Sequence, residues 1–281
     1  MRKDQAISLR EKIIQENVKI IVCSGGKGGV GKSVVSVNLS LALAHLGKKV
    51  LLFDADVGFA NDELLLGVSA PRTLKDYLKG KLELEDVLVP TSYGVWLLSG
   101  GMDVEDIVTF NIESKHRLIG DFLRIISKMD YVIMDTSAGY HENLHNFFDA
   151  ADHLISITTP EATSLMNTYT FLKYLVLNGF EPRFHLVVNM VKNIEEGRKT
   201  AEKLKQVMKR FLNVDLDGMY IMKYDNEVKK SVILQKPFIL SSKKGQPYFA
   251  MMKMASELAN ISLKPRKLPF IERIIKLFGA G

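Results

Sequence analysis

The sequence predicts an α/β fold in which helices cover both faces of a mostly parallel sheet. Short apolar runs rich in β-branched residues alternate with stretches that carry aliphatic residues at helical spacing, a pattern typical of parallel sheets with helical crossovers. A glycine-rich loop connects the first run to the first helical stretch, and aspartates follow two later runs. Ligands of such folds bind at the carboxyl ends of the strands, so we expect the functional site there.

The alternation places the predicted elements along most of the chain. Apolar, β-branched runs predict strands at Val18–Cys23, Lys49–Phe53, Val95–Leu98, Tyr131–Asp135, His153–Thr158, Phe184–Asn189 and Met219–Met222. The spacing of apolar residues predicts helices at Val34–Leu46, Lys115–Ser127, Ala162–Leu177 and Glu195–Phe211. The glycine-rich loop therefore lies between a strand and a helix N-terminus.

Composition fits one globular domain between two short terminal segments. A chain of 281 residues with 47% hydrophobic and 25% charged residues can bury a core of its own. We divide it into an N-terminal segment, residues 1–17, a globular domain, residues 18–262, and a C-terminal segment, residues 263–281. No apolar run is long enough to span a bilayer, and the N-terminus lacks a secretory pattern. We therefore expect a cytoplasmic location.

Cysteine content and charge argue against two classes of site. Cys23 is the only cysteine, which excludes intramolecular disulfides and a cysteine-only metal cluster within one chain. The net charge of +6 arises largely towards the C-terminal end, and no nucleic-acid-binding motif accompanies it. We expect no direct binding of nucleic acid, and basic residues beside apolar ones favour an anionic membrane surface instead.

Residues 25–33 match a phosphate-binding loop. Glycines let successive backbone N–H groups face the phosphates, the last lysine contacts the β/γ oxygens, and the following hydroxyl contacts Mg²⁺. A helix N-terminus at the end of the loop favours an anion further. The predicted nucleotide-binding residues of this loop are Gly26, Lys27, Gly28, Gly29, Val30, Gly31, Lys32 and Ser33.

The loop contains one lysine more than this chemistry needs. Lys27 lies near the start of the loop, where its side chain is poorly placed for a phosphate held by its own loop. It could reach a phosphate held by a facing subunit. Nucleotide would then hold a dimer together.

Aspartates follow two predicted strands at the edge where a nucleotide would need them. Asp54 and Asp56 follow one strand, and Asp135 ends another, with Gly139 shortly after it. Carboxylates of this kind can hold Mg²⁺, directly or through water. The predicted metal-binding residues are Ser33, Asp54 and Asp135, and Asp56 is the candidate for orienting the attacking water. Each aspartate could instead cap a turn.

These segments together resemble the deviant Walker A, switch I and switch II motifs of the MinD/ParA family of P-loop ATPases. The resemblance covers about Val18 to Asn260. It implies ATP, ADP and Mg²⁺ as ligands and an ATP-dependent homodimer. It also implies catalytic roles for Lys27, acting across the interface, for Lys32, and for Asp56.

The same resemblance implies an adenine site at the end of a later strand. The family's adenine-reading asparagine maps onto Asn189, and the loop from Lys223 to Asp225 would flank the base. The proline expected in that loop is absent, which makes the match weaker there.

The N-terminal segment resembles a motif of the FlhG family, also called FleN or YlxH, the MinD-like regulators of flagellar number and placement. The five matching residues are Asp4, Gln5, Ala6, Leu9 and Arg10. The resemblance implies that this segment stimulates an FlhF-like GTPase, in which a glutamine can position the attacking water. The alternative is a solvated helix with no partner.

The C-terminal segment contains a predicted amphipathic helix after a basic linker. Its apolar face carries Phe270, Ile271, Ile274, Ile275, Leu277 and Phe278, and Glu272, Arg273 and Lys276 are placed on the polar face. Such a helix can bind a membrane surface, weakly as one copy and more tightly as two. The alternative is a helix docked on its own domain, and reversible docking is compatible with both.

Together with the sequence observations, these resemblances imply a slow, partner-stimulated Mg-ATPase that cycles between the cytoplasm and the membrane and regulates flagella. Flagellar switch proteins or a flagellar transcription regulator are further candidate partners. The rivals are a division-site selector of the MinD type and a non-hydrolysing scaffold or transcription-factor antagonist. A DNA-segregating ATPase would need DNA binding with a steep salt dependence, and an electron-transferring relative would need more cysteines.

Overall fold

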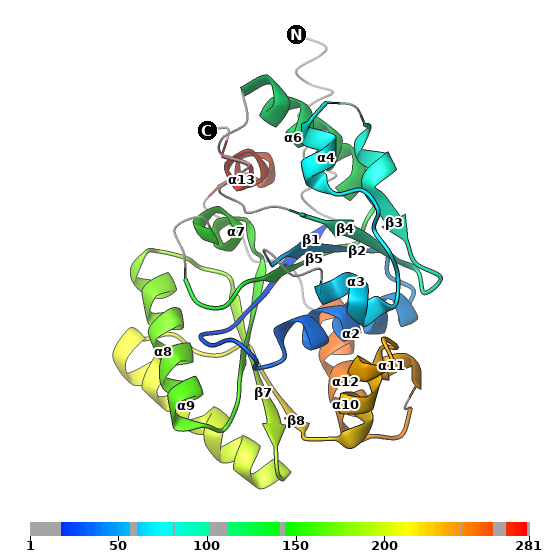
Figure 1. Ribbon diagram of the computed structural model, residues 1–281. Coiled ribbons are helices and arrows are strands. Elements are labelled where there is room, and N and C mark those ends of the chain that lie inside the picture. Colours follow the sequence, from blue (N-terminus) through cyan, green and yellow to red (C-terminus); the bar gives the residue numbers. More distant parts are fainter. Residues whose placement is uncertain are drawn as a thin grey trace.

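The computed structural model describes residues 18–56, 61–80, 82–101, 112–140, 144–241, 243–260 and 268–279. A central sheet of eight strands has the order β3-β4-β2-β5-β1-β6-β7-β8 (Figure 1). All neighbours are parallel except β3 and β4. The strands are β1 (Lys19–Ser24), β2 (Val50–Ala55), β3 (Leu88–Pro90), β4 (Val95–Ser99), β5 (Tyr131–Thr136), β6 (His153–Thr158), β7 (Arg183–Val191) and β8 (Gly218–Lys223).

The α/β architecture and every predicted strand are confirmed, with small shifts at the strand ends. Among the described residues, the strand that the sequence did not predict is β3, a three-residue antiparallel edge strand ending in Pro90. Proline has no N–H for a ladder and is tolerated at such an edge. Three residues are too few to show the alternation of apolar and polar side chains that marks a strand. Only the pairing with β4 therefore identifies β3.

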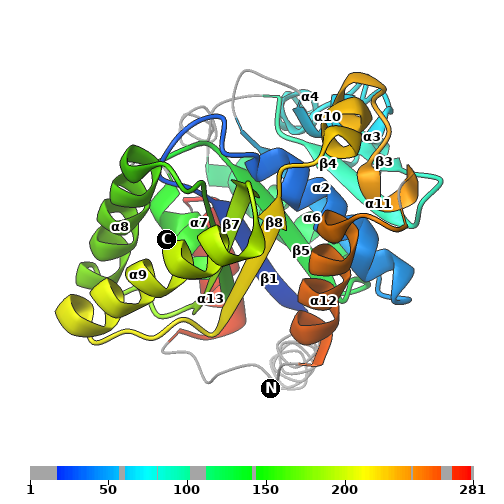
Figure 2. The same cartoon turned by 90° about the horizontal axis from the view of Figure 1, so that it is seen from below.

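Two layers of helices cover the sheet (Figure 2). One layer contains α6 (Ile112–Ile126), α7 (His145–Ala150), α8 (Ala162–Leu177), α9 (Ile194–Leu212) and α13 (Phe270–Leu277), with α4 (Leu74–Leu78) and the 3₁₀ helix η1 (Leu84–Val87) beside them. The other contains α2 (Lys32–His45), α11 (Phe238–Ser241) and α12 (Gln246–Asn260), with α3 (Asn61–Leu66) and α10 (Asn226–Ile233) near its edge. Each layer packs on its own hydrophobic cluster.

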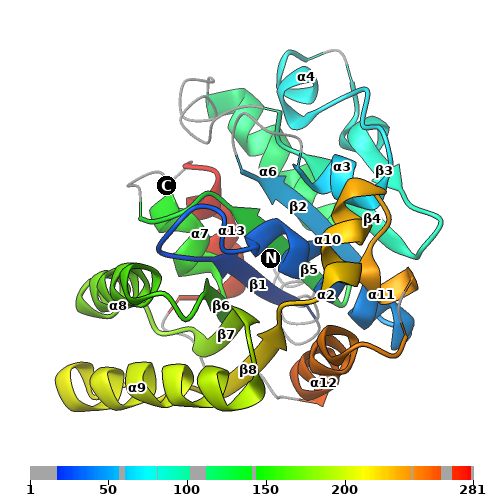
Figure 3. The same ribbon diagram turned by 60° about the horizontal axis from the view of Figure 1, so that its bottom comes forward.

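The helix after the glycine-rich loop is buried on nearly all sides. α2 lies between the sheet and α12 (Figure 3), and most of its residues are buried. Its sequence is apolar around much of the helix rather than on one stripe, as expected for a helix with partners on opposite sides. This packing fixes the helix N-terminus at the carboxyl edge of the sheet, beside the ends of β2 and β5.

The C-terminal helix α13 is docked on its own domain. Phe270, Ile274, Leu277 and Phe278 are each at most 1% exposed, and they belong to the same hydrophobic cluster as α6 and α7. The Phe278 ring meets the Phe122 ring of α6 edge-on, at 5.0 Å between centroids. The structure therefore has the docked arrangement, one of the two alternatives that the sequence left open.

The assignment of Arg273 to the polar, outward face of this helix was wrong. Arg273 is 3% exposed, and its Nη1 donates to Asp152 Oδ1 at 2.9 Å and to the carbonyl oxygen of Ala150. The other oxygen of Asp152 accepts from the backbone N–H of Ile20 at the start of β1. A periodicity argument cannot foresee a buried arginine whose partner lies 121 residues away.

Candidate functional site

Backbone geometry explains why the loop after β1 is rich in glycine. Gly29 and Gly31 have φ angles of 76° and 91°, a left-handed region that strains residues with a side chain. A Cβ on Gly26 would lie 2.3 Å from the backbone carbon of Asn167 in α8, and one on Gly31 would lie 2.5 Å from Asn189 Nδ2. The loop therefore keeps its shape only with glycine at these positions.

The loop ends at a helix N-terminus suited to an anion. Gly31 is the N-cap of α2, no side chain caps it, and the first turn carries no acidic residue. The free N–H groups and the positive end of the helix dipole can therefore face a phosphate. The backbone N–H of Gly139 donates to the carbonyl oxygen of Gly25 at 2.8 Å, so the segment after β5 is connected to this loop.

The N-terminus of α2 brings together Lys32, Ser33 and Asp135. Asp135 is fully buried, and its Oδ1 accepts from the Ser36 hydroxyl at 2.7 Å. Burial raises the pKa of Asp135 to about 6, while the hydroxyls of Ser33 and Ser36 and the ammonium of Lys32 pull it down. The predicted pairing of a lysine, a hydroxyl and a carboxylate at one edge of the sheet is thus present in the structure.

A second carboxylate, that of Asp54, lies beside Asp135. Their backbones are in register between β2 and β5, and Asp54 is 3% exposed. Burial raises the pKa of Asp54 to about 7, and the charge of Asp135 adds to the rise. Its oxygens accept from the backbone N–H groups of Asp56 at 3.1 Å and Asp62 at 3.4 Å.

Asp62 is a third buried carboxylate that the sequence reasoning missed. Oxygens of Asp54, Asp62 and Asp135 lie within 4.8 Å of one another. Within the described part of the chain, both oxygens of Asp62 and Oδ2 of Asp135 have no hydrogen-bond partner. Hard oxygen ligands with unused lone pairs suit Mg²⁺, so the residues present fit this ion, and Ser33, Asp54 and Asp135 would hold it. The role of Asp56, which is half-buried at the end of β2, stays a prediction.

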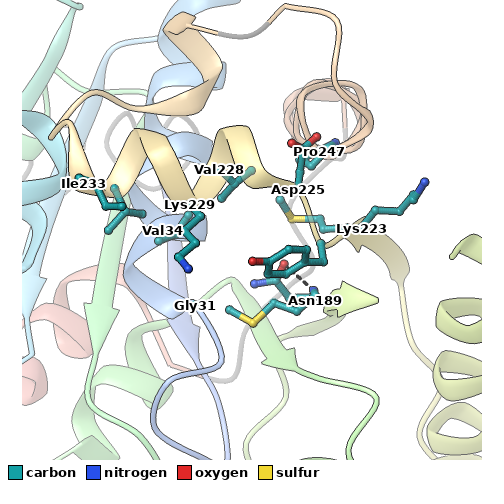
Figure 4. A pocket seen from close by; sticks show the side chains of 13 residues that line it. Gly31, Val34, Asn189, Lys223, Asp225, Val228, Lys229, Ile233 and Pro247 are labelled. Carbon is teal, nitrogen blue, oxygen red and sulfur yellow. Dashed lines mark hydrogen bonds between the residues drawn. The ribbon is translucent and has the colours of Figure 1, made fainter. Parts of the chain in front are cut away.

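A largely apolar pocket of about 500 Å³ opens beside the loop (Figure 4). Asn189 is in its wall, where β7 has an irregular register before Val191 and Met190 has a positive φ of 58°. The pocket is lined by Gly31, Val34, Asn189, Met190, Met222, Lys223, Tyr224, Asp225, Val228, Lys229, Val232, Ile233 and Pro247. The predicted base-binding residues Asn189, Lys223 and Asp225 therefore do come together.

The side chain of Asn189 also supports the loop. Its Nδ2 donates to the carbonyl oxygen of Val30 at 2.9 Å, and its Oδ1 accepts from the backbone N–H of Met190. An amide group has a second N–H and a second lone pair. Asn189 can therefore position the loop and still offer one donor and one acceptor to a base.

Lys223 and Asp225 contribute to the pocket differently from expectation. Figure 4 shows the Lys223 side chain extending away from the pocket centre. The Asp225 carboxylate caps α10, because its Oδ1 accepts from the backbone N–H of Glu227 at 2.8 Å. Both residues line the wall, while the lysine that the sequence reasoning missed there is Lys229 of α10.

Lys27 forms an ion pair on the surface of the protein. Its Nζ lies 3.0 Å from Glu161 Oε2, and the two side chains are 42% and 64% exposed. Glu161 is the N-cap residue of α8. The pair holds Lys27 at the exposed side of the loop. Its predicted action across a dimer stays a prediction.

Sequence comparison identifies the family. The profile of the ParA family, described as "NUBPL iron-transfer P-loop NTPase", matches residues 16–264. The chain belongs to the ParA/MinD family of P-loop NTPases. As a member of this family it is a P-loop ATPase, with ATP or ADP and Mg²⁺ as ligands. The sequence offers no pair of cysteines for the iron transfer named in the family description, since Cys23 is its only cysteine and is buried.

Similar members of the ParA/MinD family include two with flagellar names. The chain is 38% identical to the antiactivator FleN of Pseudomonas aeruginosa over 78% of each chain. It is 30% identical to the flagellum site-determining protein YlxH of Helicobacter pylori over 94% of this chain and 92% of that one.

Solved structures of the family have the same fold. The septum site-determining protein MinD of Pyrococcus horikoshii, complexed with Mg-ADP, is 26% identical, with a TM-score of 0.69 over 86% of this chain and 96% of that one. The MinC:MinD complex of Aquifex aeolicus gives a TM-score of 0.70 at 23% identity, over 89% of this chain and 99% of that one.

The remaining predicted residues lie at the two ends of the chain. Asp4, Gln5, Ala6, Leu9 and Arg10 fall outside the described residues. Of the predicted membrane-facing side chains, four are buried and Ile275 is half-buried against the domain, while Ile271 is half-buried at its surface. The four buried ones are Phe270, Ile274, Leu277 and Phe278. Among the described residues, no helix combines the length and the apolar character needed to cross a bilayer.

Proposed function

We propose that this ParA/MinD ATPase dimerises on ATP, binds a membrane surface in that state, and regulates the number or placement of flagella. The observation that carries the proposal is the position of Lys27, exposed at the rim of a complete nucleotide loop and held there by one surface ion pair. The similarity to FleN and YlxH supports the flagellar assignment.

Different residues of this chain have different roles in the hydrolysis of ATP. Lys32 and the loop N–H groups would bind the phosphates, and Ser33, Asp54 and Asp135 would hold the ion. Bound Mg²⁺ would neutralise charge that develops on the phosphate oxygens. Asp56 orients the attacking water. Turnover is slow in the free protein, since a second subunit and a partner complete the site.

ATP is expected to draw Lys27 away from Glu161. A γ-phosphate carries more negative charge than one carboxylate, and an exposed ion pair holds its partners weakly, by about 1 kcal/mol or less. The ammonium of Lys27 can therefore exchange Glu161 for a phosphate held by a second copy. Loss of that phosphate on hydrolysis reverses the exchange.

Light scattering tests this dimer. The Asp56→Ala variant should be dimeric with Mg-ATP and monomeric with Mg-ADP, because it retains the triphosphate. Adding Lys27→Ala to that variant should abolish the dimer, whereas adding Lys79→Ala, which removes another lysine from a surface ion pair, should not. An Asp56→Ala protein that stays monomeric with Mg-ATP would overturn the mechanism.

Membrane binding requires α13 to leave its groove. Four apolar side chains, Phe270, Ile274, Leu277 and Phe278, would move from the core to lipid and remain out of water, so their hydrophobic stabilisation of about 1.5–3 kcal/mol each largely persists. Arg273 would exchange Asp152 for an anionic lipid headgroup. The docked and membrane-bound states are therefore close enough in energy for a switch.

Contacts from the nucleotide loop to α13 offer a route for that switch. Gly139, which follows β5, donates to Gly25 of the loop, and α7 comes shortly after it in the chain. α13 packs mainly on α7. A nucleotide-dependent shift of the segment after β5 would move α7 and loosen the groove. Two released helices in one dimer would bind a membrane more tightly by on the order of 10² to 10⁴ than one.

Sedimentation with anionic vesicles tests the membrane step. Ile275 is half-buried in the docked state, so Ile275→Asp should disturb docking less than lipid insertion and should abolish ATP-dependent sedimentation. Glu272→Gln, on the exposed side of the same helix, should leave sedimentation unchanged or stronger. Equal sedimentation with Mg-ATP and Mg-ADP would contradict nucleotide control.

The N-terminal segment is proposed to stimulate an FlhF-like GTPase. Its residues 4–10 carry a glutamine that can position a water in the partner's site. GTP hydrolysis by such a GTPase should rise with the full chain and fall to its basal rate with Gln5→Ala, whereas Ser8→Ala should behave as the native chain. Stimulation by a chain lacking residues 1–12 would remove this reason for the flagellar assignment and leave the division-site alternative.

A further inference from the structure

Asp62 is a buried carboxylate without a hydrogen-bond partner among the described residues. It belongs to the first turn of α3 and is fully buried, and neither oxygen accepts a hydrogen bond from any residue that the structure describes. Its own backbone N–H donates to Asp54, which holds the start of α3 against the end of β2. The side chain therefore points into the site with both of its oxygens unused.

Among the residues that the structure describes, the charged groups that act most on Asp62 are other aspartates. Burial raises the pKa of Asp62 well above its ordinary value, and the charges of Asp135, Asp54 and Asp56 raise it further. Isolated buried carboxylates are strongly unfavourable unless a cation, a hydrogen bond or a proton compensates them. Three carboxylates with oxygens within 4.8 Å of one another therefore need compensation of one of these kinds.

We propose that Asp54, Asp62 and Asp135 form a site that binds a divalent cation, Mg²⁺ or Mn²⁺, before nucleotide arrives, with Asp62 as a ligand. The ion site extends the proposed function. It rests on that function only for the use of the ion once ATP has bound. Octahedral coordination with ion–oxygen distances of about 2.1 Å places ligand oxygens about 3–4 Å apart. The three side chains can meet this requirement with small movements.

An ion held in this way would join three elements of the site. Asp54 belongs to β2, Asp135 to β5 and Asp62 to α3, so the ion would fix α3 on the sheet edge. Nucleotide would then enter a site whose ion and helix are already in place. The nucleotide-free protein would contain the ion whenever the cation is abundant.

Protonation of Asp62 is the competing explanation, and one substitution separates the two. Asp62→Asn has nearly the shape of a protonated aspartate but is a much weaker ligand. If a proton compensates the charge of the cluster, Asp62→Asn and the native chain should show the same cation binding. If an ion compensates it, the variant should lose that binding while gaining thermal stability in a chelator.

Mn²⁺ titration of the nucleotide-free protein, followed by electron paramagnetic resonance of the free ion, is the direct experiment. The native chain should bind one Mn²⁺, Asp62→Asn should bind it at least about tenfold more weakly, and the adjacent Glu63→Gln should differ by less than about twofold. Absence of binding in the native chain at millimolar Mn²⁺, or equal binding by Asp62→Asn, would overturn the proposal.

Thermal unfolding and ATP binding complete the test. Mn²⁺ should raise the unfolding temperature of the native chain and of Glu63→Gln but not that of Asp62→Asn. Asp62→Leu, which fills the site with an apolar side chain, should likewise show no Mn²⁺ stabilisation and provides a second variant if the asparagine variant folds poorly. Failure of the native chain to bind Mg-ATP would refute the proposed function, whereas the nucleotide-free titration judges the ion site separately.

Discussion

Two ion pairs of nearly equal length hold the two parts of the molecule that are expected to move. Lys27 Nζ lies 3.0 Å from Glu161 Oε2 at the nucleotide loop, and Arg273 Nη1 lies 2.9 Å from Asp152 Oδ1 under α13. The side chains of the first pair are 42% and 64% exposed, and both side chains of the second are 4% exposed. Their geometry is similar, but their surroundings differ.

Burial decides what it costs to break each pair. Water replaces the lost partner of an exposed charge, so surface pairs contribute about 0–1 kcal/mol. Removing one partner of a buried pair leaves an uncompensated charge, which destabilises by about 3–5 kcal/mol. The nucleotide loop therefore needs little free energy to release Lys27. Release of α13 would require a larger compensating interaction, such as the proposed contact of Arg273 with lipid phosphates.

The largest effect on stability is expected from removing one partner of the buried pair. Arg273→Met should lower the free energy of unfolding by about 3–5 kcal/mol, because Asp152 stays buried without its cation. Urea unfolding measures this change, and Lys276→Met, on the exposed side of the same helix, should change it by less than about 0.5 kcal/mol. Combining Arg273→Met with Asp152→Asn should recover part of the loss, and a loss below about 1 kcal/mol would contradict the buried charge.

The second largest effect on stability is expected from a substitution in the nucleotide loop beside Lys27. Gly31→Ala should lower the free energy of unfolding by about 1–3 kcal/mol, because the φ angle of 91° and the nearby Asn189 amide both oppose a Cβ. It should also weaken ATP binding. Gly28→Ala should have a smaller effect on stability, since a Cβ there meets no atom within 4 Å.

A smaller effect on stability is expected from the pH-dependent ionisation of the carboxylate cluster, measured in the presence of a chelator. Burial raises the pKa of Asp54 to about 7 and that of Asp135 to about 6, so between about pH 4 and pH 7 the folded protein holds protons that the unfolded chain releases. The stability contribution of these groups therefore falls as the pH rises through this window. Asp54→Asn should raise the unfolding temperature more at pH 8 than at pH 5.

That pH effect has a clear contrary outcome. An equal change of the unfolding temperature at both pH values would show that Asp54 is ionised throughout in the folded protein. Adding Mn²⁺ should oppose the effect in the native chain, because the cation favours the ionised carboxylates.

The smallest stability effect is expected from the exposed pair. Glu161→Gln should change the free energy of unfolding by less than about 1 kcal/mol. It should nevertheless increase ATP-dependent dimerisation of Asp56→Ala a few-fold, because Lys27 no longer has a competing partner. Analytical ultracentrifugation measures this, and Glu195→Gln, in another exposed lysine–glutamate pair, serves as the control. Unchanged or weaker dimerisation would show that the pair does not compete with the interface.

The sequence by itself determined the central architecture and the nucleotide loop. The seven predicted strands, the predicted helices and the glycines of residues 25–33 depend on neighbours in the chain, since periodicity and backbone conformation are local properties. Asp54 and Asp135 could be predicted for the same reason, because each follows an apolar strand and parallel strands end at one edge.

Only the tertiary structure decided the features that depend on distant partners. Asp62 joined the carboxylate cluster because the start of α3 lies beside the end of β2, and Arg273 became buried because α13 docks over Asp152. The Asn189 amide contacts the loop across 159 residues of sequence, and β3 exists only by pairing with β4. Burial and charge compensation arise when separate elements pack, so spacing along the chain carries no record of them.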